Sequence, residues 1–173
     1  MSLYLQPLTE QDGMNTYYML QAIGRDENGS FHEVNGMSQT DYVQWLKKHS
    51  HPTSQQLPGE ENCTSYWLME NGQPIGFGRI RKVAIGTQPL REEVRLDYAV
   101  MPSQQGKGHG TALLKLLLEE CEKHNIPEVE ISANQDNERS NRVIRQNGGI
   151  LCKTRSGKNI YHIRCFSPSN RFR

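Results

Sequence analysis

The sequence predicts an α+β domain in which one central mixed β-sheet is flanked by helices. Several segments alternate apolar and polar residues with the period of two that is typical of strands, as in residues 94–100. Apolar residues after Thr111 recur instead at helical spacing, and Asn71-Gly72 is a strong hairpin signal. The expected order is β-α-α-β-β-β-α-β-α-β-β. Without an internal repeat or a shift in composition, residues 1–173 are expected to form a single domain.

The chain is expected to open with a strand over Leu3–Leu8, where polar and apolar residues partly alternate. Thr9 is the predicted cap of the first helix, because Asp12 stands three residues later in the capping-box position. Gly24 is the predicted end of that helix.

A second helix is predicted to begin near Ser38, with apolar side chains recurring along one side of it. The stretch before it, residues 25–36, is polar. Residues 51–62 are rich in Pro, Ser, Gln and Glu and are expected to form an exposed loop.

The middle of the chain is predicted to be β-structure. Strands over residues 66–69 and 74–81 flank the hairpin signal, because both positions of an Asn-Gly turn readily take positive φ. Residues 84–92 are expected to connect to the alternating strand that follows.

The last third is predicted to hold two helices, one short strand and a hairpin. The first helix carries its leucines at helical spacing from Thr111 and ends at Asn125 and Pro127. The remaining predicted elements are a strand over 129–132, a helix over 138–146 capped by Asn137 and stopped by Gly148-Gly149, and a hairpin of 150–153 with 159–166.

Composition excludes several classes of protein. The chain has 20 Lys+Arg against 19 Asp+Glu, and this balance argues against a dedicated nucleic-acid binder. No apolar run approaches the length of a membrane span and no signal peptide is evident, so no membrane association is expected.

The four cysteines are scattered without a C-x-x-C pair. This pattern favours reduced thiols in a cytoplasmic protein over a disulfide framework. His49, His51 and Cys63 lack a fourth ligand at zinc-like spacing, so no metal site is expected.

Three glycines, Gly106, Gly108 and Gly110, stand where the strand over 94–100 passes to the leucine-rich helix. A helix N-terminus presents unpaired N–H groups, and glycines let main chain approach oxygen atoms closely. The sequence therefore predicts a phosphate cradle over Gln105–Thr111, with Lys107 adding charge. The P-loop and dinucleotide-binding patterns both fail here, which argues against a nicotinamide-dependent oxidoreductase.

The spacing that fits is Gln105-x-x-Gly108-x-Gly110. It resembles the acetyl-CoA motif [RQ]-x-x-G-x-[GA] of the GCN5-related N-acetyltransferase (GNAT) family. The segment Asn137–Gly149 is similar to a second motif of that family, N-x-x-[AS]-x-x-[LV]-x-x-x-x-G. With the order of elements, the resemblance covers essentially the whole chain and implies the GNAT fold and an acetyl-CoA-dependent N-acetyltransferase.

The resemblance also implies a ligand site in a V-shaped opening between the strand ending at Val100 and the strand over 129–132. Main chain of the first strand would pair with the pantetheine arm, and the glycine-rich bend would hold the pyrophosphate. The residues implied to bind acetyl-CoA are Tyr98, Val100, Gln105, Gly106, Lys107, Gly108, His109, Gly110, Thr111, Asn137 and Ser140.

The catalytic residues are less clear, because the positions where relatives often carry the base are the apolar Val94 and Leu96. The nearest carboxylates, Glu93 and Asp97, are the candidate catalytic residues. Strict alternation points them to the opposite face unless a bulge shifts the register.

The proton donor for the leaving thiolate is also unassigned. Where many relatives carry a tyrosine for this step, this chain has Ile144. Tyr161 on the last hairpin is one substitute, a packed tyrosine is the alternative role for it, and solvent is another donor.

The expected acceptor is a primary amine of a small molecule or a protein amino group. Acidic residues of the N-terminal half would attract a cationic amine or else are simply solvated: Asp26, Glu27, Glu33, Glu60 and Glu61. The alternative function is a CoA-binding sensor or interaction module without turnover. A homodimer through the terminal hairpin is compatible with the fold, but no residue decides it.

Overall fold

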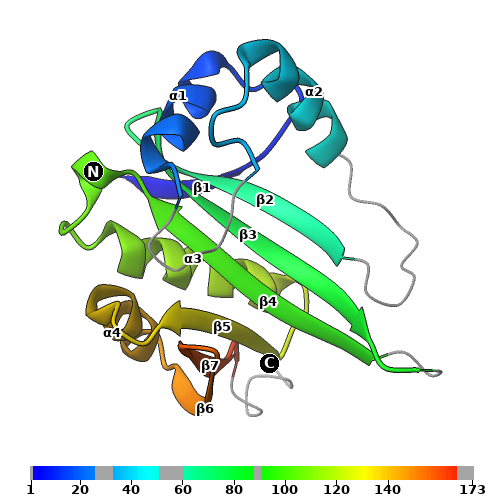
Figure 1. Cartoon of the computed structure of the whole chain (residues 1–173), viewed down its shortest axis with the longest axis vertical. Helices are drawn as coiled ribbons and strands as arrows, with labels where there is room; N and C mark the ends of the chain where they lie inside the picture. The colour runs from blue at the N-terminus through cyan, green and yellow to red at the C-terminus, as the bar shows by residue number, and fades with distance from the viewer. Residues whose placement is uncertain (1, 26–32, 51–60, 88–90, 167–173) are drawn as a thin grey trace.

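The computed structural model describes residues 2–25, 33–50, 61–87 and 91–166. It contains one mixed sheet of seven strands in the order β1-β2-β3-β4-β5-β7-β6, with four α-helices around it (Figure 1). The predicted α+β class and GNAT-type order of elements are confirmed. The strands are β1 (Leu3–Pro7), β2 (Glu61–Glu70), β3 (Gln73–Ile85), β4 (Arg91–Val100), β5 (Glu128–Asn134), β6 (Ile150–Arg155) and β7 (Lys158–Arg164). The helices are α1 (Met14–Ile23), α2 (Gln39–His49), the 3-10 turn η1 (Pro102–Gln104), α3 (His109–Lys123) and α4 (Glu138–Gln146).

The predicted start of the first helix at Thr9 is wrong, because α1 begins after Gly13. The Asp12 carboxylate does accept the N–H of Thr9, at 2.8 Å, but it also accepts the indole N–H of Trp67 at 2.6 Å. Asp12 therefore links the turn that begins at Thr9 to Trp67 of β2 instead of capping a helix. The end of α1 at Gly24 is confirmed, with a φ of 62°.

The second helix is confirmed, since the Ser38 hydroxyl caps α2 by accepting the N–H of Asp41 at 3.1 Å. The predicted loop over residues 84–92 is partly wrong. The ladder between β3 and β4 extends to the pair Ile85↔Arg91, and only residues 86–90 separate the two strands. Residues 51–60, most of the other predicted loop, lie outside the described residues.

Because successive side chains of β2 point to opposite faces of the sheet, this strand contributes to two apolar cores, one on each face. Trp67 packs with α1 and α2 on one face, whereas its neighbour Leu68 packs with α3 and α4 on the other. Gly78 of β3 explains how α3 comes so near the sheet: a Cβ added there would lie 2.8 Å from a methyl carbon of Leu117. Within the described residues, no helix is both long and apolar enough to cross a membrane.

The parallel neighbours β4 and β5 are joined at one register pair, Arg95↔Glu130. Beyond it the two strands separate, while β5 keeps seven paired residues with β7 on its other side. The carboxyl ends of β4 and β5 therefore border an opening in the sheet, where α3 and α4 begin (Figure 1). This is the V-shaped opening that the resemblance implied.

Candidate functional site

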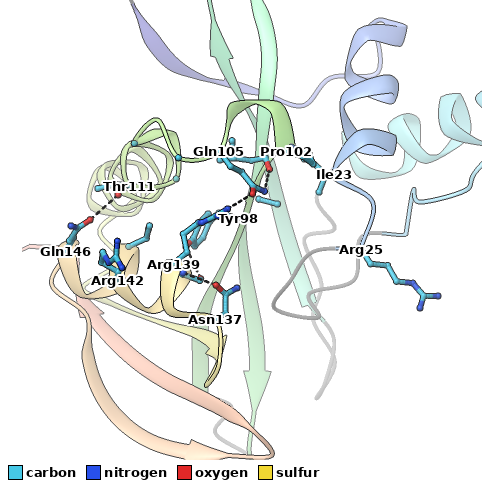
Figure 2. Close-up of a pocket in the computed structure, with 17 residues that line it drawn as sticks. Ile23, Arg25, Tyr98, Pro102, Gln105, Thr111, Asn137, Arg139, Arg142 and Gln146 are labelled. Carbon is cyan, nitrogen blue, oxygen red and sulfur yellow. Dashed lines mark hydrogen bonds between the residues drawn. The ribbon is translucent and has the colours of Figure 1, made fainter.

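A cavity of about 560 Å³ lies at this opening, within the size range of ligand sites. Its walls come from the end of β4, the bend that leads into α3, the first turns of α3 and α4, and the C-terminal end of α1. Figure 2 shows Tyr98 between the bend at Gln105 and the start of α4 at Asn137.

The bend requires glycine at two positions. Gly106 and Gly108 have φ values of 75° and 84°, a region that residues with a Cβ adopt only with strain. Gly108 is also the residue before the first turn of α3. The predicted reason for the glycine cluster is thus supported by geometry, because a tight left-handed bend delivers the chain to a helix N-terminus beside the cavity.

The main-chain N–H groups from Gly106 to Thr111 find no acceptor within the described parts of the chain. Unsatisfied amides at a helix N-terminus, together with the helix dipole, form an anion-binding site. The cradle is one residue shorter than predicted, because the N–H of Gln105 is donated to the Pro102 carbonyl at 3.3 Å.

The charge of the cavity also suits an anion. Arg139 and Arg142 of α4 line it, and Arg139 hydrogen-bonds the side-chain oxygen of Gln105 across the mouth. Arg25 lines it as well, although Figure 2 shows its side chain directed away from the other lining residues. No Asp or Glu of the described chain lines this cavity. A ligand with several phosphate groups fits the amides and the arginines together.

The start of α4 forms the opposite wall. Asn137 caps this helix by accepting the N–H of Ser140 at 3.1 Å. The hydroxyl of Ser140 lies 3.0 Å from that of Tyr98, so the Tyr98 side chain reaches from β4 to α4. The sequence pointed only to the main chain of Tyr98. A polar tip among the apolar side chains of its strand is the signal that could have drawn attention to the Tyr98 side chain.

Nine of the eleven residues that were predicted to bind acetyl-CoA line this cavity: Tyr98, Val100, Gln105, Gly106, Gly108, Gly110, Thr111, Asn137 and Ser140. Lys107 does not, since its ammonium donates to the side chain of Gln104 at 3.1 Å. His109 does not line it either, and its side chain is buried. The Val100 carbonyl already accepts the side-chain amide of Gln105 at 3.1 Å.

The two candidate catalytic carboxylates do not line the cavity. Asp97 faces β3, where Arg79 lies 3.2 Å from it and Arg81 is a second ion-pair partner. These arginines occupy both carboxylate oxygens. A catalytic role for Asp97 stays a prediction.

Glu93 lies near the closed end of the β4–β5 opening, beside Glu130 and 3.5 Å from Arg95. A hydrogen bond from Glu130 is the main cause that lowers the pKa of Glu93. Burial, and then the neighbouring Glu93, raises the pKa of Glu130. When the pair binds a single proton, these opposite shifts place it on Glu130. A catalytic role for Glu93 also stays a prediction.

The two positions considered for a proton donor are both buried away from the cavity. Ile144 is fully buried in the core. Tyr161 is 1% exposed, and its hydroxyl donates to the side-chain oxygen of Asn141 at 2.6 Å. The packed-tyrosine role therefore describes Tyr161, and the tyrosine that lines the cavity is Tyr98.

Of the acidic residues considered for the acceptor, Glu33 is described. It accepts the indole N–H of Trp45 at 3.1 Å and lies 3.6 Å from His49. The other four side chains lie outside the described residues. His51, part of the histidine pair considered as a metal hint, lies outside them too, and the described residues hold no group of metal-binding side chains.

A sequence profile of the Acetyltransferase (GNAT) family matches residues 26–148 of this chain. These residues include the bend, α3 and all of α4, and so both motifs on which the resemblance rested. No curated protein matches the chain.

Solved structures show the same fold. The GNAT domain of S. lividans PAT superposes with a TM-score of 0.68 at 15% identity, covering 92% of this chain and 89% of that one. Aminoglycoside acetyltransferase AAC(6')-Ib, in complex with coenzyme A, gives 0.64 at 22% identity and covers 93% of both chains. Campylobacter jejuni N-acetyltransferase PseH, in complex with acetyl coenzyme A, gives 0.62 at 12% identity, covering 94% and 99%.

Proposed function

Because the chain belongs to the acetyltransferase (GNAT) family, we propose that it is an acetyl-CoA-dependent N-acetyltransferase. Its acceptor is a primary amine of a small molecule or an amino group of a protein. The observation that carries the proposal is the row of main-chain amides from Gly106 to Thr111. They have no acceptor of their own within the described chain, and Gly106, Gly108, Gly110 and Thr111 among these residues line the cavity. The four free cysteines favour a cytoplasmic enzyme.

The residues of the cavity fit acetyl-CoA part by part. The amides of the bend and the N-terminus of α3 bind the diphosphate, and Arg139 and Arg142 bind further phosphate oxygens. On the side of β4 that faces β5, the residues beyond Arg95 pair with no strand of the described chain, so their main-chain groups are available to the amides of the pantetheine arm. When bound, acetyl-CoA supplies an acetyl group activated as a thioester.

The acceptor amine must lose a proton, because an alkylamine is mostly protonated at neutral pH. For the base we retain Glu93 and Asp97, on the opposite face of β4. Holding the amine close to the thioester in the orientation for attack supplies much of the rate enhancement. Removal of the amine proton by a base adds to it.

For the proton that the departing thiolate takes up, we assign Tyr98 as the donor. Its hydroxyl lies on the cavity wall, and the Ser140 hydroxyl beside it at 3.0 Å can hold or pass on the proton. A phenol and a thiol have similar reference pKa values, about 10 and about 8.5, so proton transfer between them is accessible.

A CoA-binding sensor without turnover is the second candidate function. The observation that favours it is the absence of carboxylates from the described lining of the cavity. Such a protein would bind CoA through the same amides and arginines and would release no thiol with any amine.

The experiment that tests the proposal measures thiol release from acetyl-CoA with a panel of amines, alongside CoA binding by calorimetry. The panel includes amino acids, polyamines, a lysine peptide and an aminoglycoside, the last because the fold neighbour AAC(6')-Ib is an aminoglycoside acetyltransferase. Gly108→Glu fills the bend with a side chain and a negative charge. Gly157→Glu is the matched control, because Gly157 also has positive φ but lies in the turn between β6 and β7.

We expect CoA to bind the wild-type chain and the control, and Gly108→Glu to lose binding. Thiol release with an amine supports the enzyme. Binding of CoA with no release across the panel supports the sensor. Equal binding of CoA by both variants contradicts the assignment of the bend.

A further inference from the structure

His109, the first residue of α3, is held between two acceptors on its buried side. Its Nδ1 lies 3.0 Å from the main-chain oxygen of Gln104, and its Nε2 lies 3.3 Å from a carboxylate oxygen of Glu70. The His109 side chain is 9% exposed and that of Glu70 is 13% exposed. Both contacts are therefore largely shielded from solvent.

The two contacts fix the orientation of the ring. A main-chain carbonyl only accepts hydrogen bonds, so Nδ1 is the donor in the contact with Gln104. The Glu70 carboxylate lies at Nε2, on the other side of the ring. Gln104 and Glu70 therefore hold the imidazole between them.

The Gln104 contact fixes the chain where the bend begins. Gln104 closes the turn η1, with its N–H donated to the Met101 carbonyl at 2.9 Å. Between it and α3 lie Gly106 and Gly108, the two residues with positive φ and the widest conformational freedom in the bend. The ring of His109 therefore joins the two ends of this flexible piece, from the first residue of α3 back to η1.

Glu70 supports this arrangement from the end of β2. A carboxylate near a helix N-terminus is favourable, because the helix dipole is positive there. Within the described chain, the Glu70 carboxylate contacts the ring of His109 at 3.3 Å. Glu70 lies outside both sequence motifs, 39 residues before His109.

We propose that Glu70 is a positioning residue for the diphosphate of CoA: it holds the ring of His109, and His109 holds the bend whose amides bind the diphosphate. Glu70 itself does not line the cavity. The inference rests on the proposed function, since it takes the bend as the diphosphate site.

The test compares Glu70→Gln with Glu119→Gln. Glu70→Gln keeps the shape and a hydrogen-bonding group but removes the charge, and Glu119→Gln makes the same change on an exposed residue of α3. Each variant is assayed with acetyl-CoA and with S-acetyl-N-acetylcysteamine, a short thioester that has no diphosphate. CoA binding is measured by calorimetry and folding by the melting temperature.

We expect Glu70→Gln to weaken CoA binding and raise the KM for acetyl-CoA about tenfold, as for the loss of a charge-assisted contact. The kcat with acetyl-CoA, and the kcat/KM with the short thioester, should stay within about twofold of wild type. Glu119→Gln should match wild type in every assay. A merely destabilised enzyme would lose activity with both donors in parallel.

A double-mutant cycle with His109→Asn tests whether Glu70 acts through His109. Asn places a neutral donor near the position of Nδ1 but cannot reach Glu70. If the proposal holds, adding Glu70→Gln to His109→Asn changes CoA affinity no further.

Independent, additive effects in this cycle, or CoA affinity unchanged in Glu70→Gln, overturn the inference. Failure of the wild-type chain to bind CoA would overturn the proposed function instead. If CoA binds but no amine is acetylated, the calorimetric cycle still decides the role of Glu70.

Discussion

The hydroxyls of Tyr98 and Ser140 lie 3.0 Å apart and join the two walls of the cavity, one on β4 and the other on α4. The two positions that the sequence analysis considered for the proton donor supply no proton-donating group to the cavity. Ile144 is apolar, and the Tyr161 hydroxyl is hydrogen-bonded to Asn141. The contact therefore gives the cavity one phenol at the place where the two strands part.

Replacing Tyr98 with Phe removes this phenol but keeps the ring. We expect kcat with acetyl-CoA to fall about a hundredfold, within the range typical of general acid catalysis, while CoA affinity stays within about twofold. Tyr161→Phe is the control: it should lower stability, because its buried hydroxyl bond to Asn141 is lost, and leave kcat nearly unchanged. An unchanged kcat in Tyr98→Phe would assign the proton to solvent.

The two candidate bases are separated by Asp97→Asn and Glu93→Gln, each followed by kcat and by urea unfolding. Asp97→Asn is expected to destabilise the fold by about 2 kcal/mol, because it leaves Arg79 and Arg81 without their carboxylate. Glu93→Gln should cost less, since that side chain is more exposed. The carboxylate that serves as base is the one whose loss lowers kcat about a hundredfold at saturating acetyl-CoA. A near-normal kcat in both variants would exclude both carboxylates as the catalytic base.

Stability should depend on pH through Glu130, whose pKa is raised above the usual 4.5 by burial and by Glu93. A raised pKa means that the folded state binds this proton more tightly than the unfolded state does. Its stabilising contribution is therefore complete below about pH 4.5 and is lost as pH rises through the folded-state pKa. The lowered pKa of Glu93 acts in the opposite direction, with stability lost as pH falls.

Glu130→Gln separates these two contributions, because the amide still donates a hydrogen bond to Glu93 without titrating. Urea unfolding from pH 4.5 to 7.5 should show the variant gaining stability relative to wild type as pH rises. A constant difference across this range would mean that the proton is not held on Glu130.

Gly78→Ala is predicted to destabilise the fold by about 1–3 kcal/mol, the usual cost of overpacking. The added Cβ would lie 2.8 Å from Leu117, and α3 would have to move away from the sheet. Combining it with Leu117→Ala should cost less than the sum of the two single changes, because the smaller side chain makes room. Additive unfolding free energies would contradict this close contact.

Most elements were predictable because their signals are local. Asn137 caps α4 through a residue three positions later, and Gly24 ends α1 with its own positive φ. The Thr9–Asp12 pattern misled because Asp12 is engaged by Trp67, 55 residues away in sequence. A local capping pattern carries no information about such a distant competitor.

The same distinction applies to the site. The bend at Gly106 and Gly108 was predictable, since glycines at a strand-to-helix junction have few other physical uses. The orientation of His109 was not, because the carboxylate that contacts it is 39 residues away, at the end of strand β2. Nor could spacing show that the ring of Tyr98 crosses to Ser140, a contact that depends on how far apart β4 and β5 stand.

The separation of β4 from β5 beyond Arg95 leaves the sheet with an interior edge as well as its two outer ones. Main-chain amides on that inner edge are expected to exchange with water without a ligand and to become protected when a ligand spans the gap. Amide hydrogen exchange along residues 96–100 would therefore report occupancy directly, before any acceptor is known. A compound library could be screened on this signal alone.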